Sequence, residues 1–366
     1  MVKRLLFSLM LLLCVNHANA SDGFKEDIEN KYNIKFGVDG TYTLQSIKSQ
    51  DVSRVFVTPY VRKIISDNSL GKTALDFSMN IVRFNNKTPV DVATQQGIAT
   101  LFNSYDTDYN ELYELYLSYT LPNNMMTLGL GQIPVSKFDS PIASDLQRFY
   151  FLNSALAQNT TFTYPTAGIG AFSQFNLDKD ITLSLGAIDA SNPLANGIHV
   201  KNLSKFSSFA SINYTPKFYA KYQASYSLLL YDKPKVEKAD FQSQGWSLYL
   251  AQDISDKHSL FLRINGASSD YPVISKSYSF GVLFDNPFNR SQNDQLGLAY
   301  SINRVNEDAT EDEVYDKYEH IIETYYDYKI NDSLSLRPDL QVYLNQSFKE
   351  DSKPEAVISL SLGLSL

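Results

Sequence analysis

Residues 333–345, SLSLRPDLQVYLN, alternate between apolar and mostly polar side chains along their whole length. The apolar set is Leu334, Leu336, Pro338, Leu340, Val342 and Leu344, and the opposite set is Ser333, Ser335, Arg337, Asp339, Gln341, Tyr343 and Asn345. Successive side chains of a β-strand point to opposite faces. The stretch therefore predicts a strand with one face that needs an apolar environment and another face that carries an arginine and a carboxylate.

The same period of two recurs along much of the chain. Further alternating segments are residues 181–187, 220–230, 259–266, 295–303 and 357–366. Short turn signals lie at 121–126, 176–180, 253–258 and 329–333, and longer polar stretches lie at 85–110, 188–206, 231–243 and 303–317. Short turns that alternate with long loops are typical of an up-and-down barrel with one tight rim and one elaborate rim.

A soluble β-sandwich is the alternative, because its strands also alternate. A sandwich would solvate its polar faces with many Lys and Glu side chains, whereas the polar faces here hold mainly Gly, Ser, Asn and Gln. Several of the 25 tyrosines lie at the ends of apolar strand faces, a position typical of a membrane–water boundary. Examples are Tyr119, Tyr300, Tyr326 and Tyr328. Together these features favour a membrane barrel over a sandwich.

The strand count follows from the length of the chain. A membrane strand takes about 10 residues, so 16 strands would give each one about 22 residues with its connection. Eight strands would leave implausibly long loops, and a barrel of eight is filled by side chains whereas one of sixteen encloses water. We therefore predict an all-β fold, a transmembrane antiparallel up-and-down β-barrel of about 16 strands with short periplasmic turns and longer extracellular loops.

The first twenty residues, MVKRLLFSLMLLLCVNHANA, have the order of an export signal. Lys3 and Arg4 precede an apolar run at 5–15, and Ala-Asn-Ala at 18–20 is a small-residue cleavage site. The run is shorter than the roughly 20 apolar residues that a membrane anchor needs. The pattern predicts a secretory signal peptide over residues 1–20.

The rest of the chain divides into two predicted parts. Residues 21–33 are expected to be a periplasmic lead-in, either a short helix or a mobile segment, and residues 34–366 the outer-membrane barrel. Cys14, the only cysteine, leaves with the signal, so neither a disulfide nor a metal–thiolate site is expected.

Charge and hydropathy narrow the class of protein further. The net charge of −8 becomes −10 when the two positive charges of the signal are removed, which argues against a nucleic-acid partner. After the signal, no segment approaches 18 consecutive apolar residues, which excludes a helical membrane protein.

Four stretches resemble the carbohydrate-selective porin family (OprB-type) of Gram-negative outer membranes. They are FKEDIENKYNIKFGVDGTYT (24–43), LYELYLSYTLPNNMMTLGLGQIPVSKFD (112–139), RFYFLNSAL (148–156) followed by YPTAGIGAF (164–172), and YEHIIETYYDYKINDSLSLRPDLQVYLN (318–345). The last is the most specific, because its E…YY…L…P-D-L-Q order exceeds simple alternation. The resemblance implies a water-filled outer-membrane channel for passive diffusion of small sugars.

A diffusion channel needs side chains that replace part of the hydration shell of the solute. Arg, Asp, Glu and Asn suit sugar hydroxyls, and an aromatic face can stack on a sugar ring. The strand phase assigns the following charged residues to the lumen: Arg62, Glu114, Lys221, Arg263, Glu319, Glu323, Arg337 and Asp339. A charge on the lipid face would cost about 2–4 kcal/mol at the bilayer midplane, which supports these assignments. Phase determines the face but not the depth, so these could also be lumen charges remote from the constriction.

Arg148 belongs to the non-strand stretch SDLQRFYFLNSAL, residues 144–156. This stretch could be a loop that folds into the pore, which would make Arg148 a pore-lining residue, or a surface loop. The acidic run at 306–316 could bind divalent cations, but it lacks the glycine-turn spacing of a calcium loop and is better explained as a solvated extracellular loop.

Signals for an enzyme are few. After the signal, the chain holds only His199, His258 and His320, and it has no H-E-x-x-H, G-x-S-x-G or phosphate-loop motif. A barrel hydrolase would need His199 or His258 beside a serine, and an adhesin with a plugged lumen is a further alternative.

The sequence thus predicts an outer-membrane porin for small hydrophilic solutes, carbohydrates in first place, with a general or ion-selective porin as the alternative. We expect no cofactor, no metal and no nucleic acid. The expected partners are small sugars and outer-membrane lipid, and a homotrimer is left open.

Overall fold

The computed structural model describes residues 21–85, 87–139, 150–162, 166–191, 205–218, 221–235, 242–268 and 272–366. The signal segment 1–20 and Arg148 lie outside the described residues. Within the described part, strands dominate, and no helix there is long and apolar enough to cross a membrane.

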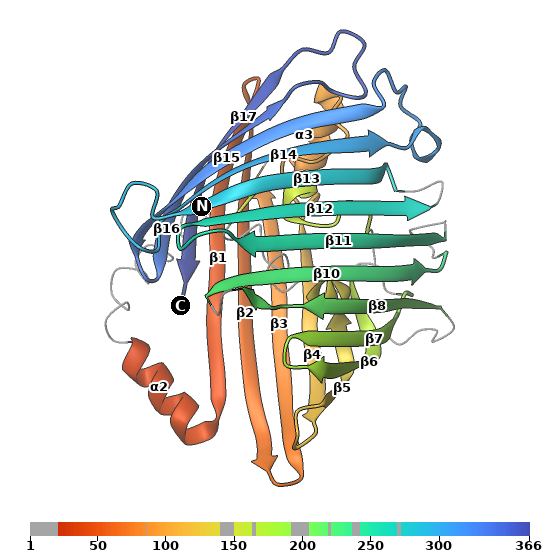
Figure 1. Cartoon of the computed structure of the whole chain (residues 1–366). Helices are drawn as coiled ribbons and strands as arrows, with labels where there is room; N and C mark the ends of the chain where they lie inside the picture. The colour runs from red at the N-terminus through yellow and green to blue at the C-terminus, as the bar shows by residue number, and fades with distance from the viewer. Residues whose placement is uncertain are drawn as a thin grey trace.

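Sixteen long antiparallel strands form one closed sheet (Figure 1). They are β1 (Ile34–Ile47), β2 (Gln50–Asn68), β3 (Gly71–Asn85), β4 (Tyr109–Thr120), β5 (Met126–Pro134), β6 (Ala167–Asp178), β7 (Ile181–Asp189), β8 (Phe206–Tyr214), β10 (Tyr222–Lys233), β11 (Ser243–Asp253), β12 (His258–Ser268), β13 (Ile274–Asp285), β14 (Gln295–Val305), β15 (Tyr318–Asn331), β16 (Leu334–Tyr343) and β17 (Glu355–Ser365). A two-residue strand, β9 (Lys217–Phe218), pairs with the start of β10. The sheet closes because β1 pairs with β2 on one side and with β17 on the other. The predicted sixteen-stranded up-and-down barrel is confirmed.

The two rims differ in the length of their connections. Short connections lie at the rim that holds both ends of the barrel, which by the general rule for such barrels is the periplasmic one. The opposite rim carries the longer connections, at 86–108, 135–166, 190–205, 234–242, 269–273, 306–317 and 344–354. The β1–β2 hairpin is the clearest exception on this rim, and the connection at 269–273 is also shorter than the periplasmic connection at 286–294. Lys48 and Ser49 form the two-residue turn of the β1–β2 hairpin with φ of 45° and 64°, as a primed hairpin turn requires.

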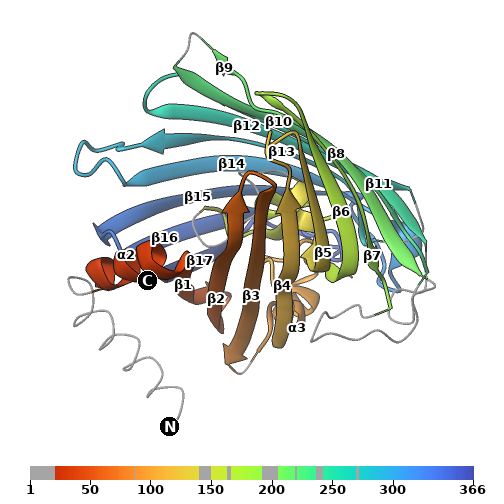
Figure 2. The same cartoon turned by 90° about the horizontal axis from the view of Figure 1, so that it is seen from below.

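The alternation along residues 333–345 separates the two faces of the wall. In β16, Arg337 and Asp339 are only 2% and 4% exposed and face the interior, whereas Leu340 is 39% exposed on the outside. Its neighbour in β17, Ile358, is 65% exposed on the same outer face. Viewed from below, the strands curve around a central space (Figure 2). The exposed fractions show that the apolar side chains of β16 and β17 lie on the outer face of this wall. The outer face therefore suits lipid and the inner face suits polar groups.

Two stretches of the extracellular connections fold back into the ring. The first infolded segment, residues 87–108, contains α3 (Pro89–Gln96), which begins with a capping box between Thr88 and Asp91. The second infolded segment comprises residues 135–139 and 150–162, with η1 (Val135–Phe138) and α5 (Ser154–Ala157). Both bury apolar side chains against the inner wall.

Outside the ring, the lead-in that precedes the barrel is helical as α2 (Ser21–Tyr32). It leads into β1 at the rim where the strand register brings the two ends of the barrel together. A short 3₁₀ turn, η3 (Glu307–Ala309), lies in the exposed acidic loop at the other rim.

Candidate functional site

Two carboxylates of β15 hold the infolded segments against the wall. Glu319 accepts hydrogen bonds from the backbone N–H groups of Ala99, at 2.9 Å, and Thr100, at 2.8 Å. Glu323 accepts from the backbone N–H groups of Leu152 and Asn153. Both glutamates are fully buried. One strand face thus anchors both segments through hydrogen bonds to buried carboxyl groups.

The anchored segments cover much of the inner wall. Gln341, which lies between Glu323 and Val357 in the strand register, donates to the backbone carbonyl of Phe102 at 3.0 Å. Asn153 donates to the hydroxyl of Tyr343 at 2.8 Å. Glu319, Glu323, Arg337 and Asp339 therefore lie on the interior face, but they are packed beneath chain rather than open to the channel.

Arg263 is also interior and covered. Its side chain is 1% exposed, and its guanidinium carbon lies 5.0 Å from the ring centre of Tyr249 on the neighbouring strand. A third buried arginine, Arg54, was not among the predicted residues, and it donates to Asn103 of the first infolded segment at 2.6 Å. Arg54 therefore holds the first infolded segment against the wall, whereas the printed contact of Arg263 is with Tyr249 of the wall itself.

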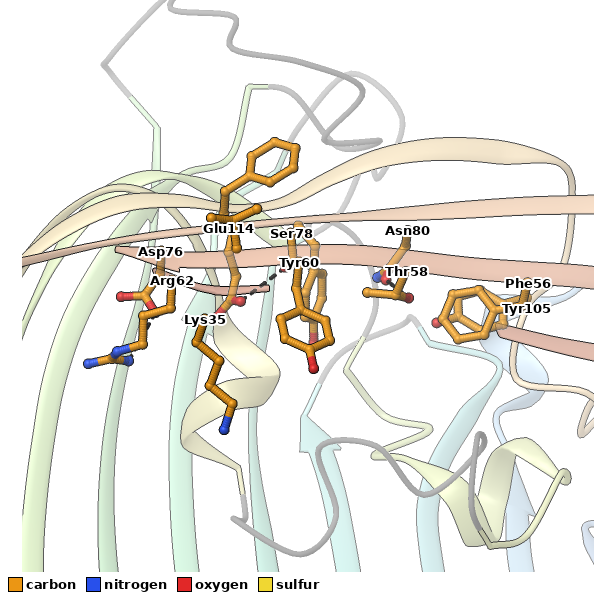
Figure 3. A pocket seen from close by; sticks show the side chains of 13 residues that line it. Lys35, Phe56, Thr58, Tyr60, Arg62, Asp76, Ser78, Asn80, Tyr105 and Glu114 are labelled. Atoms are coloured by element: carbon orange, nitrogen blue, oxygen red, sulfur yellow. Dashed lines mark hydrogen bonds and ion pairs between the residues drawn. The ribbon is translucent and has the colours of Figure 1, made fainter. Parts of the chain in front are cut away.

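An open polar cavity remains on the inner face of β1 to β4, with a volume of about 290 Å³ (Figure 3). Its lining includes Lys35, Thr58, Tyr60, Arg62, Asp76, Ser78, Asn80, Tyr105, Tyr113 and Glu114. Of the predicted residues, Arg62 and Glu114 belong to this cavity. It is the part of the described interior where a hydrophilic solute can contact charged, amide, hydroxyl and aromatic groups together.

Opposite charges are paired along this cavity wall. Arg62 Nη1 lies 2.9 Å from Asp76 Oδ1, a pair that Figure 3 shows beside the side chain of Lys35. Glu114 accepts from Ser78 at 3.0 Å and from Lys137, of the second infolded segment, at 3.1 Å. The wall therefore presents many donors and acceptors with little net charge.

Lys137, whose side chain is 38% exposed, keeps its charge. Burial by itself would lower the pKa of the Lys137 ammonium, but the nearby Glu114 carboxylate and Tyr116 phenol outweigh this effect and raise the pKa. The nitrogen also lies 4.7 Å from the ring centre of Tyr116, a cation–π distance. Lys137 therefore remains a fixed cation at the cavity at neutral pH.

Three predicted features lie elsewhere. Lys221 sits in the turn before β10 at the periplasmic rim, where its ammonium is 2.6 Å from a carboxylate oxygen of Asp256. It is exposed and remote from the inner wall. Arg148 and His199 fall outside the described residues.

The serine–histidine contact that a hydrolase would need does occur, at Ser255 and His258, with 2.8 Å between Oγ and Nδ1. Ser255 is half-buried in the short β11–β12 turn and His258 is exposed at the start of β12. The Ser255 hydroxyl also accepts from the backbone N–H of Lys257. This geometry is that of a turn-stabilising serine. Among the described residues, which include the acidic run at 306–316, no group of three or more His, Cys, Asp or Glu side chains is arranged to hold a metal.

Sequence reasoning missed much of the cavity. Asp76 and Asn80 lie in the long β3, and the alternation of side chains along this strand could have assigned both residues to the inner face. Lys35 and Tyr105 line the cavity, and Lys137 pairs with the lining residue Glu114. They come from a strand end and two loops, and no periodic signal connects them. Their convergence depends on the fold.

Comparisons with known proteins agree with this architecture. The model of the family described as "Carbohydrate-selective porin, OprB family" matches residues 211–366. Porin AaxA of Chlamydia pneumoniae is 32% identical over 299 residues, which cover 81% of this chain and 68% of that protein. Porin AaxA of Chlamydia caviae is 30% identical over 347 residues, covering 91% and 77%.

Solved structures show the same fold at much lower sequence identity. The high-pH structure of OprB from Pseudomonas putida superposes with a TM-score of 0.76 at 12% identity, covering 94% of this chain and 96% of that one. The anion-selective porin of Comamonas acidovorans gives a TM-score of 0.56 at 10% identity, covering 91% and 99%.

Proposed function

Since this chain belongs to the carbohydrate-selective porin family, we propose that it conducts small carbohydrates across the outer membrane by passive diffusion. The protein is an outer-membrane porin, and its family and fold indicate a channel rather than an enzyme. In this proposal the polar cavity on β1 to β4 is part of the solute path.

One observation carries the preference for carbohydrates. The cavity wall pairs its charges, Arg62 with Asp76 and Glu114 with Lys137, and adds hydroxyl, amide and tyrosine groups between them. A neutral solute with many hydroxyls can exchange its hydration shell for such a wall without an unbalanced charge. The rings of Tyr60 and Tyr105 offer apolar faces for a sugar ring.

The organisation of the chain is part of the same proposal. Residues 1–20 act as a removable signal peptide, residues 21–33 remain in the periplasm, and residues 34–366 form the barrel in contact with outer-membrane lipid. Three barrels associated as a homotrimer would bury part of the outward apolar face. Chemical cross-linking in native outer membranes tests that assembly.

Liposome swelling tests the solute preference. We expect proteoliposomes to swell faster with glucose than with a zwitterion of matched size. The double variant Arg62→Ala, Asp76→Ala should slow glucose entry relative to the zwitterion, because it removes hydrogen-bonding groups without changing net charge. Lys72→Ala, at the periplasmic β2–β3 turn, serves as the control. Equal swelling with both solutes in the unmodified protein would favour a general porin, and no solute entry would favour an adhesin.

Lys137 allows a prediction about ion preference. Because the pKa of Lys137 is raised, its side chain stays protonated from neutral pH up to the pH at which an ordinary lysine begins to lose its proton. We therefore expect the ratio of anion to cation permeability to stay constant over that interval. Lys137→Gln should shift the reversal potential in a salt gradient toward cation preference, because Glu114 then lacks its partner. A reversal potential unchanged by Lys137→Gln would place this lysine away from the ion path.

A further inference from the structure

An outward-facing row of residues crosses six strands toward the extracellular end of the barrel. Neighbours in direct strand register along this row are Leu230, Trp246, Gly266, Lys276, Arg304 and Tyr318. The row faces outward because the adjacent residues Ser277 and Asn303 are fully buried on the inner face.

Two cations stand directly opposite each other in this row. Lys276 of β13 and Arg304 of β14 are register partners, and both are exposed. Like charges that face each other across an antiparallel pair destabilise the sheet. In the described residues, no ion pair includes either of them. An anion that contacts both side chains would offset the repulsion between them, because each cation would then be attracted to the anion.

A groove of about 600 Å³ lies beside Lys276, the register partner of Arg304. Leu230, Trp246 and Gly266 line it, and Lys276 borders it. Gly266 matters because a Cβ at this position would lie 3.0 Å from Trp246 Nε1, so the indole lies against the bare backbone of the glycine. The groove therefore has an apolar floor at Leu230 and Trp246 next to Lys276, while its far side carries the polar side chains of Ser208, Asp232 and Gln244.

The height of the row matches a membrane boundary. Trp246 is 38% exposed and Tyr318 is 44% exposed, and these aromatic side chains flank the row as they do at bilayer interfaces. The next outward-facing row toward the periplasm is Leu248, Ile264, Tyr278 and Ile302, which is mostly apolar. The cations therefore lie where the lipid-facing belt ends and lipid headgroups begin.

We propose that this row binds the phosphate of an anionic lipid in the outer leaflet. Lys276 and Arg304 contact the phosphate, and an acyl chain of the same lipid lies in the groove against Trp246. The joined cationic edge and apolar floor favour a lipid over a soluble phosphate, which would use only the cations. Asp232, at the far side of the groove, is three strands from Lys276 and interacts with Gln242 at 3.3 Å.

Trp246 is the only tryptophan of the chain, so its fluorescence reports on this groove without a label. The experiment titrates the detergent-solubilised protein with a phosphoglycerol lipid that carries brominated acyl chains, and with a phosphocholine lipid that carries the same chains. We expect the anionic lipid to quench Trp246 at the lower concentration. Lys276→Gln and Arg304→Gln should each reduce this preference about fivefold, as expected for one basic residue at an anionic membrane surface.

Lys217→Gln is the matched control, because Lys217 is an exposed cation at the periplasmic end of the same wall. Heat-modifiable migration on gels confirms that each variant is folded. Equal quenching by both lipids, or a preference that survives in the Lys276→Gln, Arg304→Gln double variant, overturns the proposal. Glycerol phosphate without acyl chains should not compete, and stoichiometric competition by it would assign the site to a soluble phosphate instead.

Discussion

Glu323→Ala is expected to raise the single-channel conductance and to make it unsteady. The carboxylate accepts backbone N–H groups of Leu152 and Asn153 in the second infolded segment. Removal of the carboxyl group leaves these backbone donors unsatisfied, at a cost of about 1–3 kcal/mol for each buried donor. The segment should then leave the wall for part of the time and open more of the lumen, which planar-bilayer recordings would detect.

Asp327→Asn is the matched control for this prediction. Asp327 lies on the same inner face of β15, but its carboxylate pairs with Lys329 at 2.9 Å near the periplasmic rim and contacts neither infolded segment in the described contacts. The Asp327→Asn variant therefore removes an acidic group from the inner face without releasing an infolded segment, so it distinguishes these two effects on conductance. If Glu323→Ala and Asp327→Asn change the conductance equally, the anchoring role of Glu323 is wrong.

Glu319 offers a parallel test within the same strand. Glu319→Ala removes the acceptor for Ala99 and Thr100, so it should release the first infolded segment and leave the second in place. The Glu319→Ala, Glu323→Ala double variant should then exceed either single change in conductance.

Leu340→Arg is expected to impair barrel assembly. Leu340 lies on the outer face of β16, between Thr324 and Ile358 in the register, and 39% of it is exposed. A charged side chain on the lipid face costs about 2–4 kcal/mol at the midplane and about 0–1 kcal/mol near the interface. The heat-modifiable, folded form should therefore decrease strongly in outer-membrane fractions.

Leu344→Arg provides the matched control for depth. Leu344 is also 39% exposed, but it follows the extracellular end of β16, so the same arginine there should be tolerated. Normal assembly of the Leu340→Arg variant would mean that the lipid-facing belt of β16 has been misplaced. Arg337→Ala, on the inner face, should assemble and alter conduction instead.

The fold was largely predictable from the sequence because a barrel strand obeys a local rule. Alternation at a period of two identifies the two faces of a strand regardless of its partners, so Arg337 and Leu340 could be assigned to opposite faces from residues 333–345 alone. Turn lengths and chain length supplied the strand number and the difference between the rims. The β1–β2 hairpin was not predicted, because its two-residue turn at Lys48 and Ser49 lies on the rim that otherwise carries long loops.

The candidate site was predictable only in part, because depth and cover are not local properties. Glu319, Glu323, Arg263, Arg337 and Asp339 do face inward, yet the infolded segments bury them. Those segments do not alternate with a period of two, so their sequence does not predict which strands they contact. Glu319 and Glu323 acquire their anchoring role only when loop N–H groups reach them across the lumen.

The sequence by itself determined the strand faces and the approximate number of strands, since these depend on the alternation of neighbouring residues and on the length of the chain. The tertiary structure decided where the interior stays open. Barrel closure and the inward folding of residues 87–108 and 150–162 leave the polar cavity at β1 to β4, where Arg62 and Asp76 from adjacent strands meet Glu114 and the loop residue Lys137. These groups converge through long-range packing, which alternation along a single strand cannot encode.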